Sequence, residues 1–150
     1  RENVLDILAR AGVAVRWLDN NSGCKGVCQR VSSIDLSRST DPALCDGREC
    51  LDGVLVNALR EDPAAGAGAD RLVVLHMKGS HGPAYYRRYP PSARRFEPTC
   101  DSNEIQRCNL DALRNTYDNG IVYTSEVLAA IIDVLAAQAD RADSVLLYVS

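Results

Sequence analysis

The sequence predicts an α/β fold, a mainly parallel sheet flanked by helices, because two kinds of hydrophobic pattern alternate along the chain. Longer segments repeat apolar residues every three or four positions, which is typical of helices. Between them, three short apolar or alternating runs are typical of strands, at 13–18, 72–76 and 145–149. Strands that alternate with helices are expected to run parallel, with the helices covering the sheet.

The first half of the chain begins with a predicted helix and strand. The helix is expected over 3–10, with Gly12 as its stop. The strand at 13–18 is rich in residues that favour β structure, and it runs directly into the polar loop 19–23. The stretch from there to about Cys50 is polar, and no helix or strand is predicted in it.

The second half continues the alternation. A helix is expected over 51–60, a Gly- and Ala-rich surface loop over 62–70, and a buried parallel strand over 72–76. A long helix follows from 110 to about 137, in which Gly120 costs on the order of 1 kcal/mol relative to alanine. The apolar face of this helix is expected to consist of Leu110, Leu113, Tyr117, Ile121, Thr124, Leu128, Ile131 and Leu135.

Charge and hydropathy limit the kinds of partner. The formal net charge of -3 gives no reason to expect nucleic acid as the main partner. No uninterrupted apolar run approaches the roughly 20 residues of a membrane helix, and the first residues lack the pattern of a secretory signal. We therefore expect no membrane segment within these residues, and any export signal or anchor to lie outside them.

The cysteines fall into three short-range groups in polar or glycine-containing stretches. These are Cys24 with Cys28, Cys45 with Cys50, and Cys100 with Cys108. Several connectivities are open, so this pairing rests on proximity. Structural zinc is the alternative, but the spacings are unusual for zinc and no suitably spaced histidine pair accompanies them. Cysteines in loops favour disulfides and an oxidising compartment.

Polar residues follow the first predicted strand, at the position where ligands bind in open α/β sheets. They are Asn20, Asn21, Ser22 and Lys25, and lysine and amide side chains suit phosphate oxygens. If the two cysteines that flank Lys25 are bonded, its ammonium is held within a small covalent loop. An ordinary solvated Asx turn is the alternative.

A histidine lies in a glycine-flanked loop beyond the second predicted strand. The loop 79–83 reads Gly-Ser-His-Gly-Pro, and the neutral imidazole of His81 can bind zinc or carry protons. A loop histidine that bonds a backbone carbonyl fits the pattern equally well, and one histidine is not a zinc site. His76 lies inside the apolar strand and is interpreted as a hydrogen-bonded core histidine.

A basic aromatic stretch covers 85–89 and 94–96. Its favoured interpretation is a surface segment whose arginine stems cover apolar area. An anionic lipid surface is the second interpretation and single-stranded nucleic acid the last, because the chain is acidic overall.

Three long motifs occur in order: WLDNNSGCKGVC at 17–28, GSHGPAYYRRYP at 79–90, and FEPTC with NEI and a further cysteine at 96–108, continuing into NTYDN. Together they resemble bacterial phosphoethanolamine–lipid A transferases over nearly the whole chain. One departure is Thr124–Ser125, where that family more often has Thr-Asp.

The resemblance implies an alkaline-phosphatase-like fold in a domain exported behind membrane helices, at the periplasmic face of the bacterial inner membrane. Such enzymes use zinc to move phosphoethanolamine from phosphatidylethanolamine to lipid A through a phosphorylated threonine, which confers polymyxin resistance. Residues 1–150 are then expected to be an internal part of a single periplasmic catalytic domain, with an incomplete sheet.

The resemblance also assigns roles to residues. His81 matches a histidine near the zinc site, which implies a ligand of a second zinc or a group that stabilises phosphoryl charge. Asn21 and Lys25 match residues that hold the substrate phosphate, and the cysteine pairs match disulfides of the family. The nucleophilic threonine and the primary zinc ligands match no position here, so the chain alone is expected to be inactive.

Two other functions remain open from the sequence. A sulfatase or phosphoglycerol transferase of the same superfamily would share the metal chemistry but not the block at 20–28. A stand-alone secreted, disulfide-bonded binding module would need no catalytic residues at all.

Overall fold

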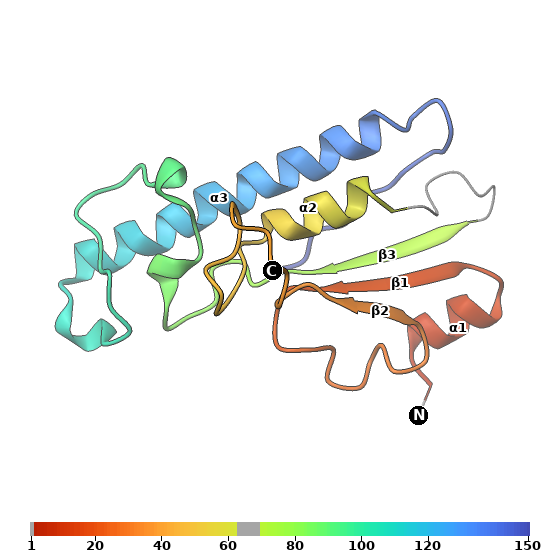
Figure 1. Cartoon of the computed structure of the whole chain (residues 1–150), viewed down its shortest axis with the longest axis horizontal. Coiled ribbons are helices and arrows are strands. Elements are labelled where there is room, and N and C mark those ends of the chain that lie inside the picture. Colours follow the sequence, from red (N-terminus) through yellow and green to blue (C-terminus); the bar gives the residue numbers. More distant parts are fainter. Residues whose placement is uncertain (1, 63–69) are drawn as a thin grey trace.

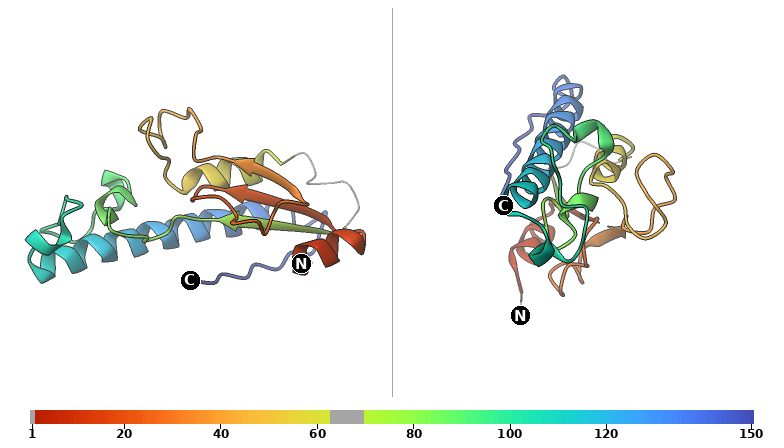
Figure 2. Two further views of the ribbon diagram at one scale, coloured as in Figure 1. Left: turned by 90° about the horizontal axis from the view of Figure 1, so that it is seen from below. Right: turned by 90° about the vertical axis from the view of Figure 1, so that its left-hand side faces the viewer.

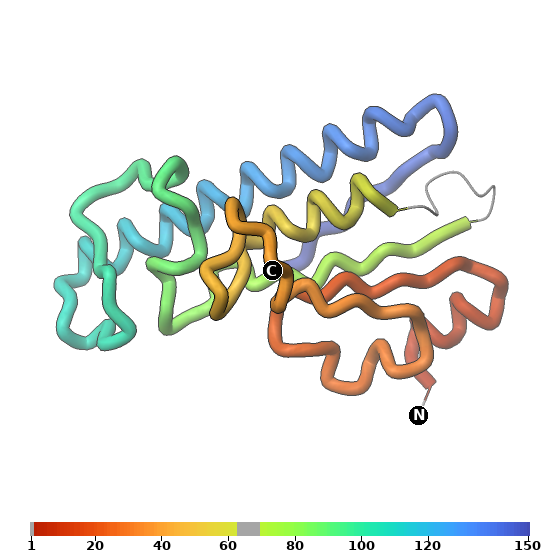
Figure 3. The backbone as a smooth tube through the Cα atoms, in the orientation of Figure 1, coloured from red at the N-terminus to blue at the C-terminus, as the bar shows by residue number. Residues whose placement is uncertain are grey.

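The structure, a computed structural model, describes residues 2–62 and 70–150. Figure 1 shows helices on both sides of a small twisted sheet. The helices and strands are α1 (Val4–Arg10), β1 (Ala14–Asp19), β2 (Ser32–Asp35), α2 (Gly53–Arg60), β3 (Arg71–His76) and α3 (Leu110–Ala136). Three single 3-10 turns lie between β3 and α3, at Tyr85–Arg87, Pro91–Ala93 and Ile105–Arg107. Figure 3 shows this connection running out along the N-terminal half of α3.

The sheet has the order β2-β1-β3, and both of its strand pairs are parallel. The register places Leu18 opposite Leu75 and Asp19 opposite His76, so β1 and β3 end at the same edge. This confirms the predicted fold class.

Two strand predictions were wrong, one by omission and one by excess. β2 was missed because all four of its residues are exposed and three of them are polar. The strand predicted at 145–149 is absent, and the side chains of Val145 and Leu147 are 95% and 82% exposed. An apolar run becomes a strand where a neighbouring strand pairs with its backbone, and none of the described strands pairs with this run.

The predicted helices are present, and local caps explain where two of them begin. The Asn3 side chain accepts from the Leu5 and Asp6 N–H groups, while the Asp6 carboxylate accepts from the Asn3 N–H, which forms a capping box for α1. The Asn109 side chain accepts from the Ala112 N–H at 2.7 Å and caps α3. The loop predicted at 62–70 lies, apart from its two ends, outside the described residues.

The main core lies between one face of the sheet and the helices α2 and α3. Two clusters of buried side chains meet there, and Val73, Leu75 and Met77 pack against both of them. Helix α1 packs beside β1, and Figure 2 shows α1 and α2 on opposite sides of the strands. The burial of these apolar side chains is the main source of stability in such a fold.

The buried face of α3 differs from the predicted one. Leu110, Tyr117 and Ile121 are 68%, 44% and 43% exposed. Thr124 and Ile131 of the predicted face are buried. The full set of buried α3 residues, several of them small or polar, is Ala112, Thr116, Asn119, Gly120, Tyr123, Thr124, Val127, Ile131 and Val134. Counting apolar positions failed here because Thr116 and Asn119 are buried by bonding the loop over them: Thr116 Oγ1 accepts from the Cys100 N–H at 2.7 Å.

Helix α3 is long and apolar enough to cross a membrane by length and composition, although the sequence shows no uninterrupted apolar run of that length. In its most apolar stretch 39% of the residues are buried inside the structure. A core helix of a soluble protein passes the same test, so α3 is weak support for a membrane span.

Candidate functional site

The loops that follow β1 and β3 share one edge of the sheet (Figure 1). The Asn20 N–H donates to the His76 carbonyl at 3.0 Å, which continues the pairing just beyond β1. The Asn21 side-chain amide donates to the Met77 carbonyl at 3.0 Å. The structure therefore joins the loop that carries Asn21 to the loop that leads to His81.

The Cys24–Cys28 disulfide closes a tight loop around Lys25. Lys25 has a φ of 50°, in the left-handed region that a non-glycine residue adopts rarely. Its Nζ donates to the Ser22 carbonyl at 3.1 Å, and the side chain is otherwise exposed. An ammonium has three donors, so Lys25 keeps donors for an anionic ligand.

His81 is exposed, and its Nδ1 lies 2.9 Å from the Gly82 carbonyl. Because a carbonyl only accepts, Nδ1 carries the proton in this arrangement, and in the neutral ring the lone pair is then on Nε2. The His81 carbonyl accepts a hydrogen bond from Arg88 Nε at 2.9 Å, and the backbone N–H of His81 donates to the Lys78 carbonyl at 3.1 Å. The backbone of His81 is thus fixed while the residue remains exposed.

Asp52, directly before α2, is a buried residue of this edge that sequence reasoning did not single out. Its carboxylate accepts from the Asn20 side chain at 2.8 Å and from the Lys78 and Gly79 N–H groups at 2.9 and 2.8 Å. Asn20 is 0% and Asp52 5% exposed. An aspartate before a helix usually signals a helix cap, so the pattern concealed a contact with a distant loop.

Glu49 forms salt bridges with three cations beside the His81 loop. Its carboxylate lies 2.7 Å from Arg88 Nη1, 3.1 Å from Lys78 Nζ and 2.9 Å from Arg87 Nε. Burial raises the pKa of Glu49, but the hydrogen bonds and charges of Arg88 and Lys78 outweigh it and hold the pKa below its ordinary value. Glu49 therefore shares one negative charge among three cations, and Asp46 supplies a second one to Arg87.

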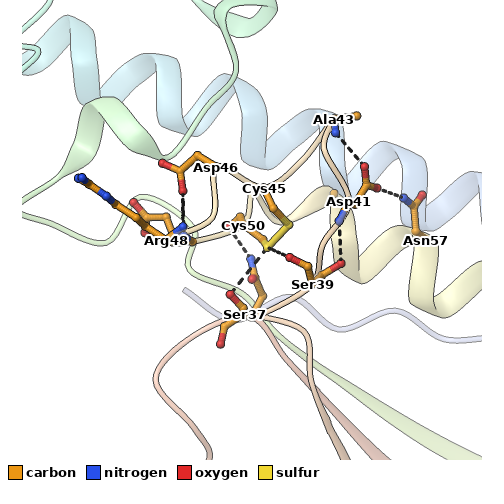
Figure 4. Close-up of a disulfide and its surroundings, with 12 residues drawn as sticks. Ser37, Ser39, Asp41, Ala43, Cys45, Asp46, Arg48, Cys50 and Asn57 are labelled. Atoms are coloured by element: carbon orange, nitrogen blue, oxygen red, sulfur yellow. Dashed lines mark hydrogen bonds between the residues drawn. A yellow bond between two sulfur atoms is a disulfide. The ribbon is translucent and has the colours of Figure 1, made fainter.

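Glu49 is carried by a small hairpin that the Cys45–Cys50 disulfide closes (Figure 4). Within it, the Asp46 carboxylate accepts from the Arg48 and Glu49 N–H groups at 2.9 Å each. These backbone bonds, together with the ion pair to a nearby arginine, lower the pKa of Asp46. The hairpin is thus a fixed support for the Glu49 carboxylate.

His76 is hydrogen-bonded, as its structural interpretation predicts, although it is only half-buried. Its Nδ1 lies 3.3 Å from Asp19 Oδ2, and its ring meets Trp17 edge-on at 5.1 Å. Burial raises the pKa of Asp19, but bonds from Asn21, Trp17 and His76 outweigh it and lower the pKa overall. His76 therefore helps to hold the end of β1.

The described residues do not form a zinc site on their own. No three His, Cys, Asp or Glu side chains in the described part of the chain come together to hold a metal ion. All the cysteines are paired, as Cys24–Cys28, Cys45–Cys50 and Cys100–Cys108, which agrees with the proximity pairing and not with structural zinc. A role of His81 as a zinc ligand remains a prediction.

The basic aromatic stretch is neutralised by acidic neighbours. Arg87 and Arg88 pair with Glu49, Arg94 pairs with Glu97 at 2.5 Å, and Arg95 pairs with an acid of α3. Paired arginines attract anionic surfaces weakly. Residues 94–96 are exposed, as the surface interpretation predicts, but 85–89 are not a surface segment, because they are half-buried and Tyr89, at 7% exposed, packs into the main core.

Fold and edge together define an α/β protein of the kind that binds ligands beyond the carboxyl ends of parallel strands. The sequence matches the sulfatase family over residues 1–150. The chain therefore belongs to the sulfatase family, a family of enzymes.

Named relatives sharpen this assignment. Phosphoethanolamine transferase EptA of Escherichia coli K12 is 45% identical over 150 residues, covering 100% of this chain and 27% of that protein. Phosphatidylethanolamine transferase Mcr-1 of Escherichia coli is 38% identical over 156 residues, covering 100% of this chain and 29% of that protein. The chain thus spans about a quarter of the length of these relatives, and the resemblance to phosphoethanolamine transferases is confirmed.

Solved structures agree with the fold. The soluble domain of lipooligosaccharide phosphoethanolamine transferase A from Neisseria meningitidis superimposes with a TM-score of 0.84 at 45% identity, covering 89% of this chain and 40% of that one. The C-terminal periplasmic domain of EcEptC from Escherichia coli, in complex with Zn, has a TM-score of 0.65 at 20% identity, covering 91% and 39%, and shares the fold.

Proposed function

We propose that this chain is part of the periplasmic catalytic domain of a transferase that moves phosphoethanolamine from phosphatidylethanolamine to a phosphate of lipid A. The observation that carries the proposal is the joining of the Asn21–Lys25 loop to the His81 loop at one edge of a parallel sheet. The identity of 45% to a phosphoethanolamine transferase over the whole chain supports it.

Phosphoryl transfer requires charge neutralisation and in-line positioning above all. In the proposed reaction a threonine oxygen forms a bond to phosphorus, the bond from phosphorus to the diacylglycerol oxygen breaks, and diacylglycerol leaves with a proton on that oxygen. A phosphate oxygen of lipid A then forms a bond to the same phosphorus, the bond to the threonine oxygen breaks, and the threonine hydroxyl is regenerated. Lys25 would neutralise a phosphate oxygen with its exposed ammonium. Asn21 donates one amide N–H to the Met77 carbonyl, which holds the loop to the sheet edge, and would donate the other to a phosphate oxygen. His81 would present Nε2 to the phosphoryl group, as a donor when protonated.

Zinc would supply further charge neutralisation and activate a hydroxyl nucleophile. Because the described residues lack a complete ligand set, its ligands and the threonine nucleophile would come from other parts of the protein, with His81 as a candidate for a second zinc. The protein would act at the periplasmic face of the inner membrane. A lipid A that carries phosphoethanolamine is less anionic, so cationic polymyxins would bind it less well.

The test uses the complete protein, with phosphatidylethanolamine labelled in its head group and lipid A as acceptor. We expect His81→Ala and Lys25→Ala each to lower the rate of transfer by about 100-fold or more, because each removes charge stabilisation from the transition state. Arg114→Ala is the matched control, since Arg114 is an exposed cation of α3 that pairs with Asp111.

Near-normal transfer by both variants would remove this edge from the mechanism. Release of inorganic sulfate from sulfate esters, or transfer of phosphoglycerol, would favour the other branches of the superfamily. A protein that binds ligands but transfers no group under any of these conditions would favour the binding module.

A further inference from the structure

Asp52 occupies the position of a helix cap, yet it does not cap its helix. An aspartate directly before a helix commonly accepts hydrogen bonds from the first N–H groups of that helix. The Asp52 side chain makes no such bond to α2. The Gly53 N–H donates instead to the Tyr123 hydroxyl at 3.1 Å. The carboxylate is therefore directed away from α2 and toward the edge of the sheet.

The two oxygens of Asp52 divide between both loops of the candidate site. Oδ2 accepts from the Gly79 N–H at 2.8 Å, while Oδ1 accepts from the Lys78 N–H at 2.9 Å and from the Asn20 amide at 2.8 Å. Lys78 and Gly79 lead directly to His81, and Asn20 precedes Asn21. One buried carboxylate thus bonds the start of each loop.

Asn20 acts in this arrangement through its donors. Its amide nitrogen donates to Asp52 and also to the Cys50 carbonyl at 3.0 Å, whereas its Oδ1 has no hydrogen-bond partner among the described residues. A buried amide oxygen without a partner is unfavourable. The side chain is therefore oriented for the two bonds that it donates, and the first of them is to Asp52.

We propose that Asp52 is a positioning residue that fixes the His81 loop relative to the Asn21 loop. It acts through backbone N–H groups and through Asn20, and its carboxylate is buried away from any ligand at the edge. The inference rests on the proposed function, because it assumes that the two loops share one phosphoryl group. A displacement of about 1 Å between such groups can lower a rate by on the order of 100-fold.

The test is a double-mutant cycle in the complete protein. Asp52→Asn keeps the shape of the side chain but replaces one acceptor oxygen by a donor that opposes a backbone N–H. We expect Asp52→Asn to lower kcat for transfer by about 10- to 100-fold in the parent and by less than about 3-fold in a His81→Ala background. The effect is smaller in that background because the His81 side chain that Asp52 positions is already missing. Asp35→Asn is the control, since Asp35 is an exposed aspartate at the end of β2 that bonds Ser37.

An equal loss in both backgrounds would show that Asp52 serves stability alone and would overturn the inference. If His81→Ala itself transfers normally, the proposed role of His81 fails. The effect of Asp52→Asn is then compared in the parent and in an Asn21→Ala background, and an equal loss in both again overturns the role of Asp52.

Hydrogen exchange gives a readout that needs no activity. The Lys78 and Gly79 amides should exchange at least about 10-fold faster in Asp52→Asn, while amides of α3 should not change. Unchanged exchange at both amides would contradict the inference. If Asp52→Asn does not fold, Asn20→Ser removes one of the three hydrogen bonds to Asp52. It should likewise lower kcat in the parent and change it by less than about 3-fold in the His81→Ala background.

Discussion

The two loops at the edge of the sheet are held in opposite ways. The loop after β1, which carries Asn21 and Lys25, is closed by a disulfide four residues apart in sequence. The loop after β3, which carries His81, contains no cysteine and is held by contacts with residues far away in sequence. The comparison shows two solutions to one problem, that of fixing polar groups at a sheet edge.

Beyond Asn21, which bonds the Met77 carbonyl, the first loop relies on its disulfide and on contacts with α1. Beyond its disulfide, it is tied to α1 by the Asn3 side chain, which donates to the Val27 carbonyl at 2.9 Å. Arg30 adds two bonds to the Asp6 carboxylate, at 2.8 and 2.6 Å. The Asn3 bond is exposed, and the Asp6 carboxylate is buried but pairs with an Arg30 side chain that is 49% exposed, so we expect the covalent bond to contribute most of the constraint.

The second loop relies on burial and close packing. A Cβ at Gly120 of α3 would lie 2.7 Å from Ser80 Oγ, so the absence of a side chain lets the loop pack directly against the helix. Tyr85 meets Tyr117 of α3 edge-on, with ring centroids 5.8 Å apart. This loop should therefore respond to changes in the core, whereas the first should respond to reduction of its disulfide.

The largest effect is expected from Gly120→Val. Its branched side chain would displace Ser80 and the loop backbone, which should lower the free energy of unfolding by about 3 kcal/mol. Gly120→Ala is the control, because a rotation of Ser80 can relieve its clash and alanine favours a helix by about 1 kcal/mol. Thermal unfolding of the two variants measures the difference. Equal stability would mean that the loop does not depend on its seat on α3.

These long-range contacts between loops and helices explain what the sequence could and could not predict. Strands β1 and β3, the helices and the disulfides follow from local patterns, and all are present, whereas β2 was missed and the strand at 145–149 is absent. The buried face of α3 does not, since Thr116 and Asn119 are buried by bonding a loop that precedes the helix by many residues. Asp52 was missed for the same reason.

Site residues divide in the same way. Lys25 and His81 stand in motifs with turn-forming glycines, so they could be singled out from the sequence. Glu49 sits in an ordinary polar stretch, and its three cations come from two other segments. No local pattern reports such a long-range charge cluster, so this part required the structure.

Removal of the first disulfide should have the next largest effect. Replacing Cys24 and Cys28 by serine should lower the free energy of unfolding by about 2 kcal/mol, from the entropy of closing a short loop. It should also raise KM for the phosphate-bearing donor, because Lys25 is no longer held. Replacing Cys100 and Cys108 by serine is the matched control, and it should cost similar stability without changing KM. A rise in KM for both pairs would contradict a local role.

Glu49→Gln should lower the free energy of unfolding by about 1.5 kcal/mol at neutral pH, since it weakens bonds to three cations. The folded pKa of Glu49 lies below its ordinary value of 4.5, so its contribution is present above that value and is lost as the pH falls through the folded pKa. The difference between parent and variant should therefore shrink on acidification. Denaturant unfolding at pH 7 and pH 3 measures it, and a constant difference would contradict the assignment.

The smallest effect is expected at the surface tie of the first loop. The Arg30 hydrogen bond, with the Asn3 N–H, lowers the pKa of Asp6 from 3.8 to about 2. Arg30→Gln should raise this pKa toward 3.8, while the Asn3 bond keeps it somewhat lower. The contribution of Asp6 to stability is present above pH 3.8 and is lost as the pH falls through about 2, so the variant should lose it at a higher pH. An NMR titration of the Asp6 carboxyl carbon measures the shift.

Arg10→Gln, at an exposed arginine of α1 that pairs with Glu2, should leave the pKa of Asp6 unchanged. Because the disulfide still closes the loop, transfer should fall less in Arg30→Gln than in the variant without Cys24 and Cys28, and the reverse order would place the main constraint on the ion pair.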